Sequence, residues 1–188
     1  MSRNRNALCL SIALVLAAPA AFAAGENIDK INGSITAEAG QGYGDLETVN
    51  GSITLESGSS ADSAETVNGS IFFDRGSRIG DGVTTVNGAI GLVETEVGGD
   101  IETVNGDITV GIGSHVGGHV KVEKPTSNWM PINLNKRKPR IVIGPNAVVD
   151  GPLIFEREVT LYVHNTARTG KITGATAVRY DGARAPQD

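Results

Sequence analysis

The chain has 188 residues and a formal net charge of −5, so it is long enough for one domain of ordinary size and too acidic overall to favour nucleic acid as a partner. Glycine is abundant at 25 residues, aromatic residues make up only 4%, and the single cysteine, Cys9, lies near the N-terminus. This composition predicts many short strands with tight corners around a narrow core, and it excludes disulfide bonds between residues of the chain.

The first residues have the three parts of a secretory signal peptide. MSRNRN carries two arginines and no acid, the apolar run after it is too short to cross a bilayer, and Ala21-Phe22-Ala23 matches an A-x-A cleavage site. We therefore expect a signal peptide over 1–23, a mature chain from Ala24, and a periplasmic or extracellular location. Cys9 lies at the start of the apolar run rather than after it, so we do not expect a lipid anchor there.

Asn-Gly pairs recur through residues 24–123 at spacings of 18, 18, 19 and 18 residues. Asn-Gly between apolar β-formers is a strong hairpin signal, so the pairs alone do not distinguish a meander of hairpins from a coil. A second corner containing glycine recurs in each later repeat, and strand-like alternation flanks the Asn-Gly corner. Two kinds of corner in a fixed period are typical of stacked coils.

We therefore predict an all-β fold: a single-stranded β-solenoid with coils of about 18 residues. At about 3.3 Å per residue such a coil has a perimeter of about 60 Å, and each turn rises about 4.8 Å. We expect the asparagine side chains to stack into a structural ladder, with glycine supplying a backbone angle that other residues adopt only at a cost. The ladder residues are Asn32, Asn50, Asn68, Asn87 and Asn105.

The insertion predicted over 124–140 interrupts this pattern. It contains three prolines, the only tryptophan and a basic run, and no acid lies between Lys124 and Arg140. Such a mixture is suited to anionic lipid headgroups or acidic polysaccharide, although the tryptophan can also pack back on the solenoid while the lysines stay in water. The residues predicted for an anionic surface are Trp129, Lys136, Arg137, Lys138 and Arg140.

Further solenoid coils are predicted over 141–180 and a flexible tail over 181–188. Charge divides along the chain: residues 24–123 contain 16 acids and 4 bases, whereas residues 124–188 contain 10 bases and 5 acids. Every solenoid ends in strands with unpaired backbone groups, and here the two ends carry opposite charge. The chain can therefore associate end to end, unless the tail or the insertion caps an end.

The segment with IGPNAVVDGPLIF and ARTGKITGATAV resembles the bactofilins, which are polymer-forming β-helix proteins. The VNGSI and VNGDI repeats are similar to exported bacterial β-solenoid proteins of unknown function described as adhesin-type. Together the two resemblances cover most of the mature chain. They imply a right-handed solenoid, possible self-assembly and no catalytic residues, while the signal peptide separates this chain from the cytoskeletal bactofilins.

The residues with catalytic or metal-binding chemistry do not form a recognisable motif. His115 and His119 flank two glycines at a predicted corner, so we expect neither a metal site nor a cofactor. Glu47, Glu65 and Glu102 recur at one position of the coil, which is typical of a solvated face rather than of a catalytic pair. Two isolated hexapeptides, IGSHVG and IGPNAV, match the repeat of left-handed acyltransferases too sparsely to predict that activity.

The sequence therefore predicts a non-enzymatic, exported structural or adhesive element of the bacterial cell envelope. The alternative is an exported carbohydrate-active enzyme or a polysaccharide-binding module on a β-helix scaffold. An enzyme would need a groove with clustered, unrepeated acids, whereas a scaffold would show repeating columns.

Overall fold

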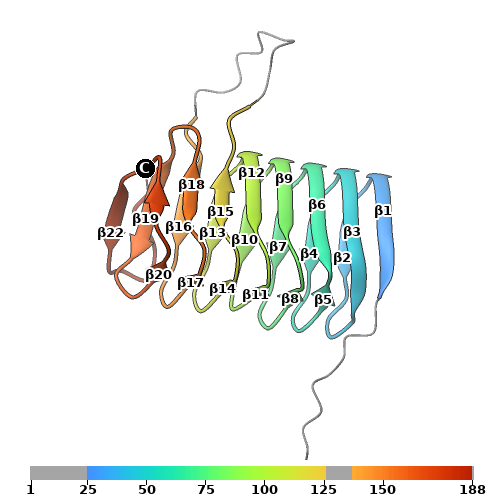
Figure 1. Cartoon of the computed structure of the whole chain (residues 1–188). Helices are drawn as coiled ribbons and strands as arrows, with labels where there is room; N and C mark the ends of the chain where they lie inside the picture. Colours follow the sequence, from blue (N-terminus) through green and yellow to red (C-terminus); the bar gives the residue numbers. More distant parts are fainter. Residues whose placement is uncertain (1–24, 126–136, 188) are drawn as a thin grey trace, which may run out of the picture.

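The computed structural model describes residues 25–125 and 137–187, and these residues form a β-solenoid (Figure 1). Its strands belong to three parallel sheets that extend along the solenoid axis, and most coils contribute one strand to each sheet. The predicted all-β solenoid is confirmed. Across the described ranges there is no helix of the length and apolarity needed to cross a membrane.

The three sheets are named A, B and C in the order in which the chain meets them. Sheet A contains, in spatial order, β1 (Glu26–Asn32), β3 (Tyr43–Asn50), β6 (Ser63–Asn68), β9 (Val83–Asn87), β12 (Ile101–Asn105), β15 (Val120–Val122), β18 (Leu153–Phe155) and β21 (Ile172–Thr173). Sheet B contains β2 (Ile35–Ala37), β4 (Ile53–Leu55), β7 (Ile71–Phe73), β10 (Ile90–Leu92), β13 (Ile108–Val110), β16 (Arg140–Ile143), β19 (Thr160–His164) and β22 (Ala177–Tyr180). Sheet C contains β5 (Ser60–Ala61), β8 (Arg78–Ile79), β11 (Glu96–Val97), β14 (His115–Val116), β17 (Val148–Val149) and β20 (Arg168–Thr169).

The Asn-Gly segments are corners of the coil and not hairpin turns. Asn50 of β3 pairs in parallel with Asn32 of β1 and Asn68 of β6, so each asparagine lies one coil from the next. The Asn-Gly corner joins a strand of sheet A to a strand of sheet B, whereas a hairpin would join two antiparallel neighbours of one sheet. The period of the repeat therefore predicts the fold better than the Asn-Gly dipeptide alone does.

Alternate residues of each strand point into a narrow apolar core. In sheet B, for example, the first inward column contains isoleucine in five successive coils, and each is at most 1% exposed. Full burial of such a side chain stabilises the fold by about 1.5–3 kcal/mol, so stacked aliphatic columns take the place of the disulfides that the chain lacks. These isoleucines are Ile35, Ile53, Ile71, Ile90 and Ile108.

Close packing between coils explains most of the corner glycines. Of the five Asn-Gly corners only the first has a positive φ, 111° at Gly33. A Cβ at Gly69 would lie 1.8 Å from the carbonyl oxygen of Gly51, and one at Gly106 would lie 1.7 Å from that of Gly88. The expectation that glycine supplies an unusual backbone angle is therefore wrong for the later corners, because successive backbones approach too closely for any side chain.

The insertion begins at the corner between sheets A and B in the sixth coil, where the first five coils have Asn-Gly. On one side of it, β15 pairs with β12 and β18, and on the other side β16 pairs with β13 and β19. The stack of coils therefore continues past the insertion. Residues 126–136 lie outside the described residues.

Each end of the solenoid has a charged residue in a core-facing column. Lys30 pairs in register with the buried Thr48, and its ammonium group donates to the carbonyl oxygen of Ser34 over 2.8 Å. Arg179 pairs with the buried Val163 at the other end. A charge at an inward position of an edge strand discourages another chain from adding to the sheet.

The chain after β22 contacts the outer face of sheet B. The guanidinium carbon of Arg140 lies 5.0 Å from the ring centroid of Tyr162, and its Nη2 donates to the carbonyl oxygen of Pro186 over 2.7 Å. Ala185 packs against a small cluster that includes Tyr162 and Tyr180. Burial raises the pKa of the Tyr180 phenol above its ordinary value, although the nearby Arg140 acts in the opposite direction. These contacts tie residues of the predicted tail, 181–188, to the last coils.

Candidate functional site

The corner between sheets A and B carries a continuous ladder of asparagine side chains. The Nδ2 group of each later asparagine donates to Oδ1 of the asparagine in the preceding coil, over 3.0 to 3.2 Å. All four bonds run in the same direction, so the ladder presents an amide nitrogen at Asn32 and an amide oxygen at Asn105. The four bonds connect five coils along the outside of the solenoid.

Arg157 ends this ladder. Its Nη1 group donates to Oδ1 of Asn105 over 2.5 Å and to the carbonyl oxygen of Val104 over 3.1 Å. Arg157 lies between β18 and β19, at the same corner but two coils beyond Asn105. Because the insertion replaces Asn-Gly in the coil between them, only a long side chain reaches the last asparagine. The bond is charge-assisted and therefore stronger than the amide bonds before it.

A second column of side chains runs beside the asparagines and ends at an acid. Asp107 occupies the fifth position of this column, where its Oδ1 accepts the backbone N–H of Arg140 over 2.8 Å. Its Oδ2 lies 2.7 Å from Nη2 of Arg137, so Asp107 holds the returning end of the insertion at two points. In the earlier coils the backbone N–H groups of Ser52, Ser70 and Ala89 donate to the hydroxyl oxygens of Ser34, Ser52 and Ser70, respectively.

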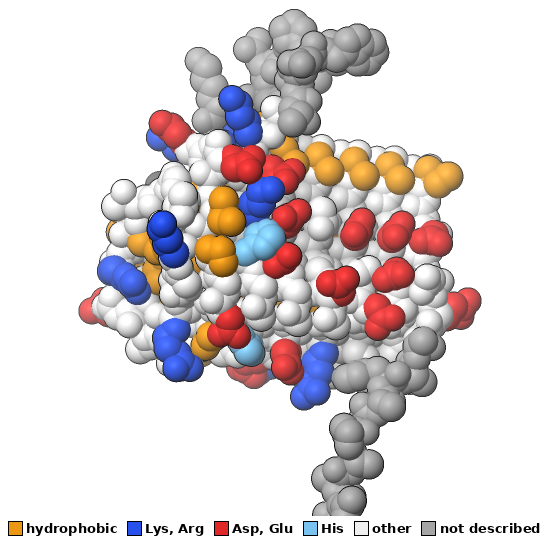
Figure 2. All heavy atoms as spheres, in the orientation of Figure 1, with side chains coloured by type: hydrophobic (Ala, Val, Ile, Leu, Met, Phe, Trp, Pro, Cys, Tyr) orange, Lys and Arg blue, Asp and Glu red, His pale blue; other side chains and the backbone are white. Residues whose placement is uncertain are grey.

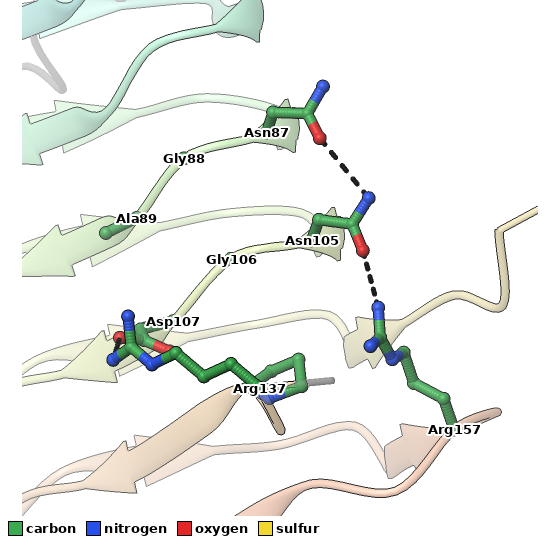
Figure 3. Close-up of a pocket in the computed structure, with 9 residues that line it drawn as sticks. Asn87, Gly88, Ala89, Asn105, Gly106, Asp107, Arg137 and Arg157 are labelled. Carbon is green, nitrogen blue, oxygen red and sulfur yellow. Dashed lines mark hydrogen bonds and ion pairs between the residues drawn. The ribbon is translucent and has the colours of Figure 1, made fainter. Parts of the chain in front are cut away.

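The end of the asparagine ladder at Arg157 and the end of the second column at Asp107 lie on either side of a cleft of about 360 Å³ (Figure 3). Gly88 and Gly106 lie between its two sides, with Arg157 reaching Asn105 on one side and Arg137 reaching Asp107 on the other. The backbone of both glycines lines the cleft between the two guanidinium groups. Two guanidinium groups against one carboxylate give the cleft an excess positive charge, which suits an anionic ligand.

The predicted basic residues of the insertion have different surroundings. Arg137 lines the cleft, and its side chain is 73% exposed. Lys138 Nζ lies 3.0 Å from Oε2 of Glu158 at an exposed position. Arg140 instead lies beside Tyr162 and bonds the tail, which gives it a structural role. Trp129 and Lys136 fall outside the described residues, so their part of the anionic-surface prediction stays a prediction.

Buried threonines bond the corner glycines in three coils but not in the coil that forms the cleft. In the fifth coil Thr103 is 1% exposed, and its Oγ1 has no hydrogen-bond partner among the described residues. The regular bonding therefore stops where the cleft begins. In the earlier coils the hydroxyls of Thr48, Thr66 and Thr85 donate to the carbonyl oxygens of Gly33, Gly51 and Gly69, respectively, over 2.9 to 3.1 Å.

Two columns of outward side chains run along the outer face of sheet A, and Figure 2 shows them as an apolar row above acidic side chains. A groove of about 370 Å³ lies along them in the first four coils. The acids recur in register, and Thr84 replaces the acid in one coil. The acidic column contains Asp29, Glu47, Glu65 and Glu102, and the apolar column contains Ile31, Val49, Val67, Val86 and Val104.

The two corner histidines bind carboxylates. Nδ1 of His119 lies 2.8 Å from Asp100 and Nε2 lies 2.9 Å from Glu102, so its two ring nitrogens contact different acids. Nε2 of His115 lies 2.7 Å from Asp150. Among the residues that the structure describes, no group of three or more histidines and acids is arranged to hold a metal ion.

Sequence reasoning missed Arg157 and Asp107, although one of them has a visible signal. VNGDI at the fifth corner places an acid where the earlier corners have serine or alanine, and this change marks Asp107 as a singular residue. Arg157 has no such mark, because it stands outside the Asn-Gly repeat, and only the three-dimensional stacking of coils brings it to Asn105.

Comparisons of the chain with protein-family models, with curated proteins and with solved structures found no match. The resemblances to bactofilins and to adhesin-type solenoids stay predictions from the sequence. The geometry of the corner, the charge along the axis and the repeating surface are therefore the observations from which a function can be argued.

Proposed function

We propose that the mature chain is an exported, non-enzymatic β-solenoid that serves as a structural or adhesive element of the bacterial cell envelope. In this role its C-terminal part contacts acidic polysaccharide. The observation that carries the proposal is the division of charge along the solenoid: residues 24–123 contain 16 acids and 4 bases, and residues 124–188 contain 10 bases and 5 acids. Because a solenoid converts position in the sequence into position along its axis, this division gives the molecule an acidic end and a basic end (Figure 2).

The repeating outer surface supports a structural or adhesive role over catalysis. The acids of sheet A stand in register in successive coils, so each has an equivalent neighbour one coil away. Glu47 and Glu65, for example, make no ion pair within the described residues, and neither is buried. A catalytic acid needs a singular environment that sets its pKa, whereas a column of equivalent groups offers many similar contacts to an extended partner.

A sugar polymer suits the basic part better than a lipid surface does. The cleft between Arg137 and Arg157 is concave and also presents the amides of Asn87 and Asn105. Polar groups around a concavity match the hydroxyls and charged groups of a sugar, while a bilayer presents a broad surface of headgroups. Acidic polysaccharide is therefore the favoured partner, and an anionic bilayer is an outcome of the test.

Between the monomer and the end-to-end polymer that the sequence leaves open, the inward charges at both ends favour the monomer. Adding a coil to either end would bury Lys30 or Arg179 between two coils, and an unpaired buried charge opposes such stacking. Adhesion then depends on the sides of the solenoid and on its basic part.

The test is sedimentation of the mature chain, residues 24–188, with polygalacturonate, with neutral dextran and with anionic phospholipid vesicles across a salt series. We expect binding to polygalacturonate at low salt, release as salt shortens the screening length, and no binding to dextran. A matched chain with 126–138 replaced by a short glycine-serine linker should bind more weakly. Binding to vesicles alone would assign a lipid partner, and binding to none of the three would contradict the proposal.

A further inference from the structure

Arg157 has hydrogen-bond donors that the ladder does not use. A guanidinium group has five N–H donors, and Nη1 of Arg157 serves Asn105 and Val104. Its Nε and Nη2 groups make no hydrogen bond with the described residues, and the side chain lines the cleft. These two groups form one planar edge, which is the geometry that binds both oxygens of a carboxylate.

The remainder of the cleft is suited to a sugar ring. Its volume of about 360 Å³ falls within the range of sites that bind small molecules. Gly88 and Gly106 line it between the two arginines (Figure 3). The ladder uses one N–H of each asparagine amide, so Asn87 and Asn105 each keep a second N–H donor for a hydroxyl.

We infer that this corner cleft binds one acidic sugar residue of the polysaccharide, with its carboxylate on the Nε–Nη2 edge of Arg157. The asparagine amides then bind sugar hydroxyls, and Arg137 adds positive charge from the opposite side while it stays paired with Asp107. This inference rests on the proposed function and adds to it the position and the chemical class of the ligand. The asparagine ladder, Arg157 at its end and the ligand site then form one continuous structure.

The test measures binding of tetragalacturonate, and of its methyl ester, to the mature chain by calorimetry at low salt. Arg157→Gln removes the planar edge. Ala89→Asp adds a carboxylate at an exposed position of the cleft, and the next coil already has an acid, Asp107, at the same position of the column. Arg168→Gln is the matched control, because it removes an exposed arginine from the same basic half on sheet C. Melting temperatures are measured for all three variants.

We expect Arg157→Gln and Ala89→Asp each to weaken binding about tenfold or more. Arg157→Gln removes the bidentate charged pair, and Ala89→Asp adds a negative charge to the cleft that repels the carboxylate of the ligand. Arg168→Gln should change the affinity less than about twofold, since an exposed charge at a distance is screened. The methyl ester should not bind. If Arg157→Gln lowers the melting temperature, the affinity of Ala89→Asp tests the cleft assignment instead, since this substitution removes no side-chain contact.

Wild-type affinity in Ala89→Asp, or equal losses in Ala89→Asp and Arg168→Gln, would overturn the cleft assignment and leave the proposed function standing. Failure of the wild-type chain to bind both tetragalacturonate and polygalacturonate would overturn the proposed function and the cleft assignment together.

Discussion

Nη1 of Arg157 lies 2.5 Å from the side-chain oxygen of Asn105, and this contact joins residues that are 52 positions apart in the chain. It ends a ladder of four amide hydrogen bonds with a charged donor, and it spans the coil in which the insertion interrupts the corner. The same guanidinium group lines the cleft, so the end of a structural repeat is also the start of the candidate binding site.

Removing one ladder amide should destabilise the solenoid. Asn68→Ala breaks the bonds to Asn50 and Asn87, and it should lower the free energy of unfolding by about 1–3 kcal/mol. Glu65→Ala, three residues earlier and outward-facing, should change it by less than about 0.5 kcal/mol. Urea unfolding of both variants measures the difference, and equal small effects would mean that the ladder does not contribute to stability.

Two buried threonines of one column should respond in opposite ways when their hydroxyl group is removed. Thr66→Val removes a hydrogen bond to Gly51 and should cost about 0.5–1.5 kcal/mol of unfolding free energy. Thr103→Val removes a buried hydroxyl that lacks a partner among the described residues, so its effect should be neutral or stabilising. The same urea experiment measures both, and a larger loss for Thr103→Val than for Thr66→Val would show that the Thr103 hydroxyl is bonded in solution.

Replacing the inward charges should allow the ends to associate. In the double variant Lys30→Ile and Arg179→Leu both terminal coils present uncharged inward side chains, as the interior of the stack does. Light scattering should show a monomeric wild-type chain and a double variant that associates as its concentration rises. The matched control is Arg75→Ile with Arg78→Leu, which alters exposed arginines away from the ends. A polymeric wild-type chain at low salt would show that the inward charges do not block stacking.

The contribution of Tyr180 to the stability of the fold should be lost at high pH. Burial raises the pKa of Tyr180 above the ordinary value of 10.0, so its protonated form is favoured in the folded state. The resulting stability is complete below pH 10 and is lost as pH rises through the folded-state pKa. Ultraviolet titration of the wild-type chain should show one phenol ionisation that is absent from Tyr180→Phe. The pH of this ionisation should lie above that of an ordinary tyrosine. A transition at or below pH 10 would contradict the buried position.

The repeat made the architecture predictable, since the period of the Asn-Gly pairs identifies coils and places all five asparagines in one column. The reason for the glycines was not predictable in the same way. A left-handed angle and a close approach of two backbones both require glycine, and the sequence alone does not distinguish them. The contact of Arg157 with Asn105 and the role of Arg140 under the tail depend on how separate coils stack, and no periodic signal marks either residue.

The most direct test of the proposed function is the ratio of dissociation constants for polygalacturonate between two charge-matched variants of the mature chain. Arg137→Gln with Lys138→Gln removes two charges at the base of the insertion, and Arg75→Gln with Arg78→Gln removes two charges from the acidic half. We predict that the first pair weakens binding about tenfold, about 1.4 kcal/mol, relative to the second. Equal affinities for the two variants would contradict the claim that the basic end of the solenoid holds the polysaccharide.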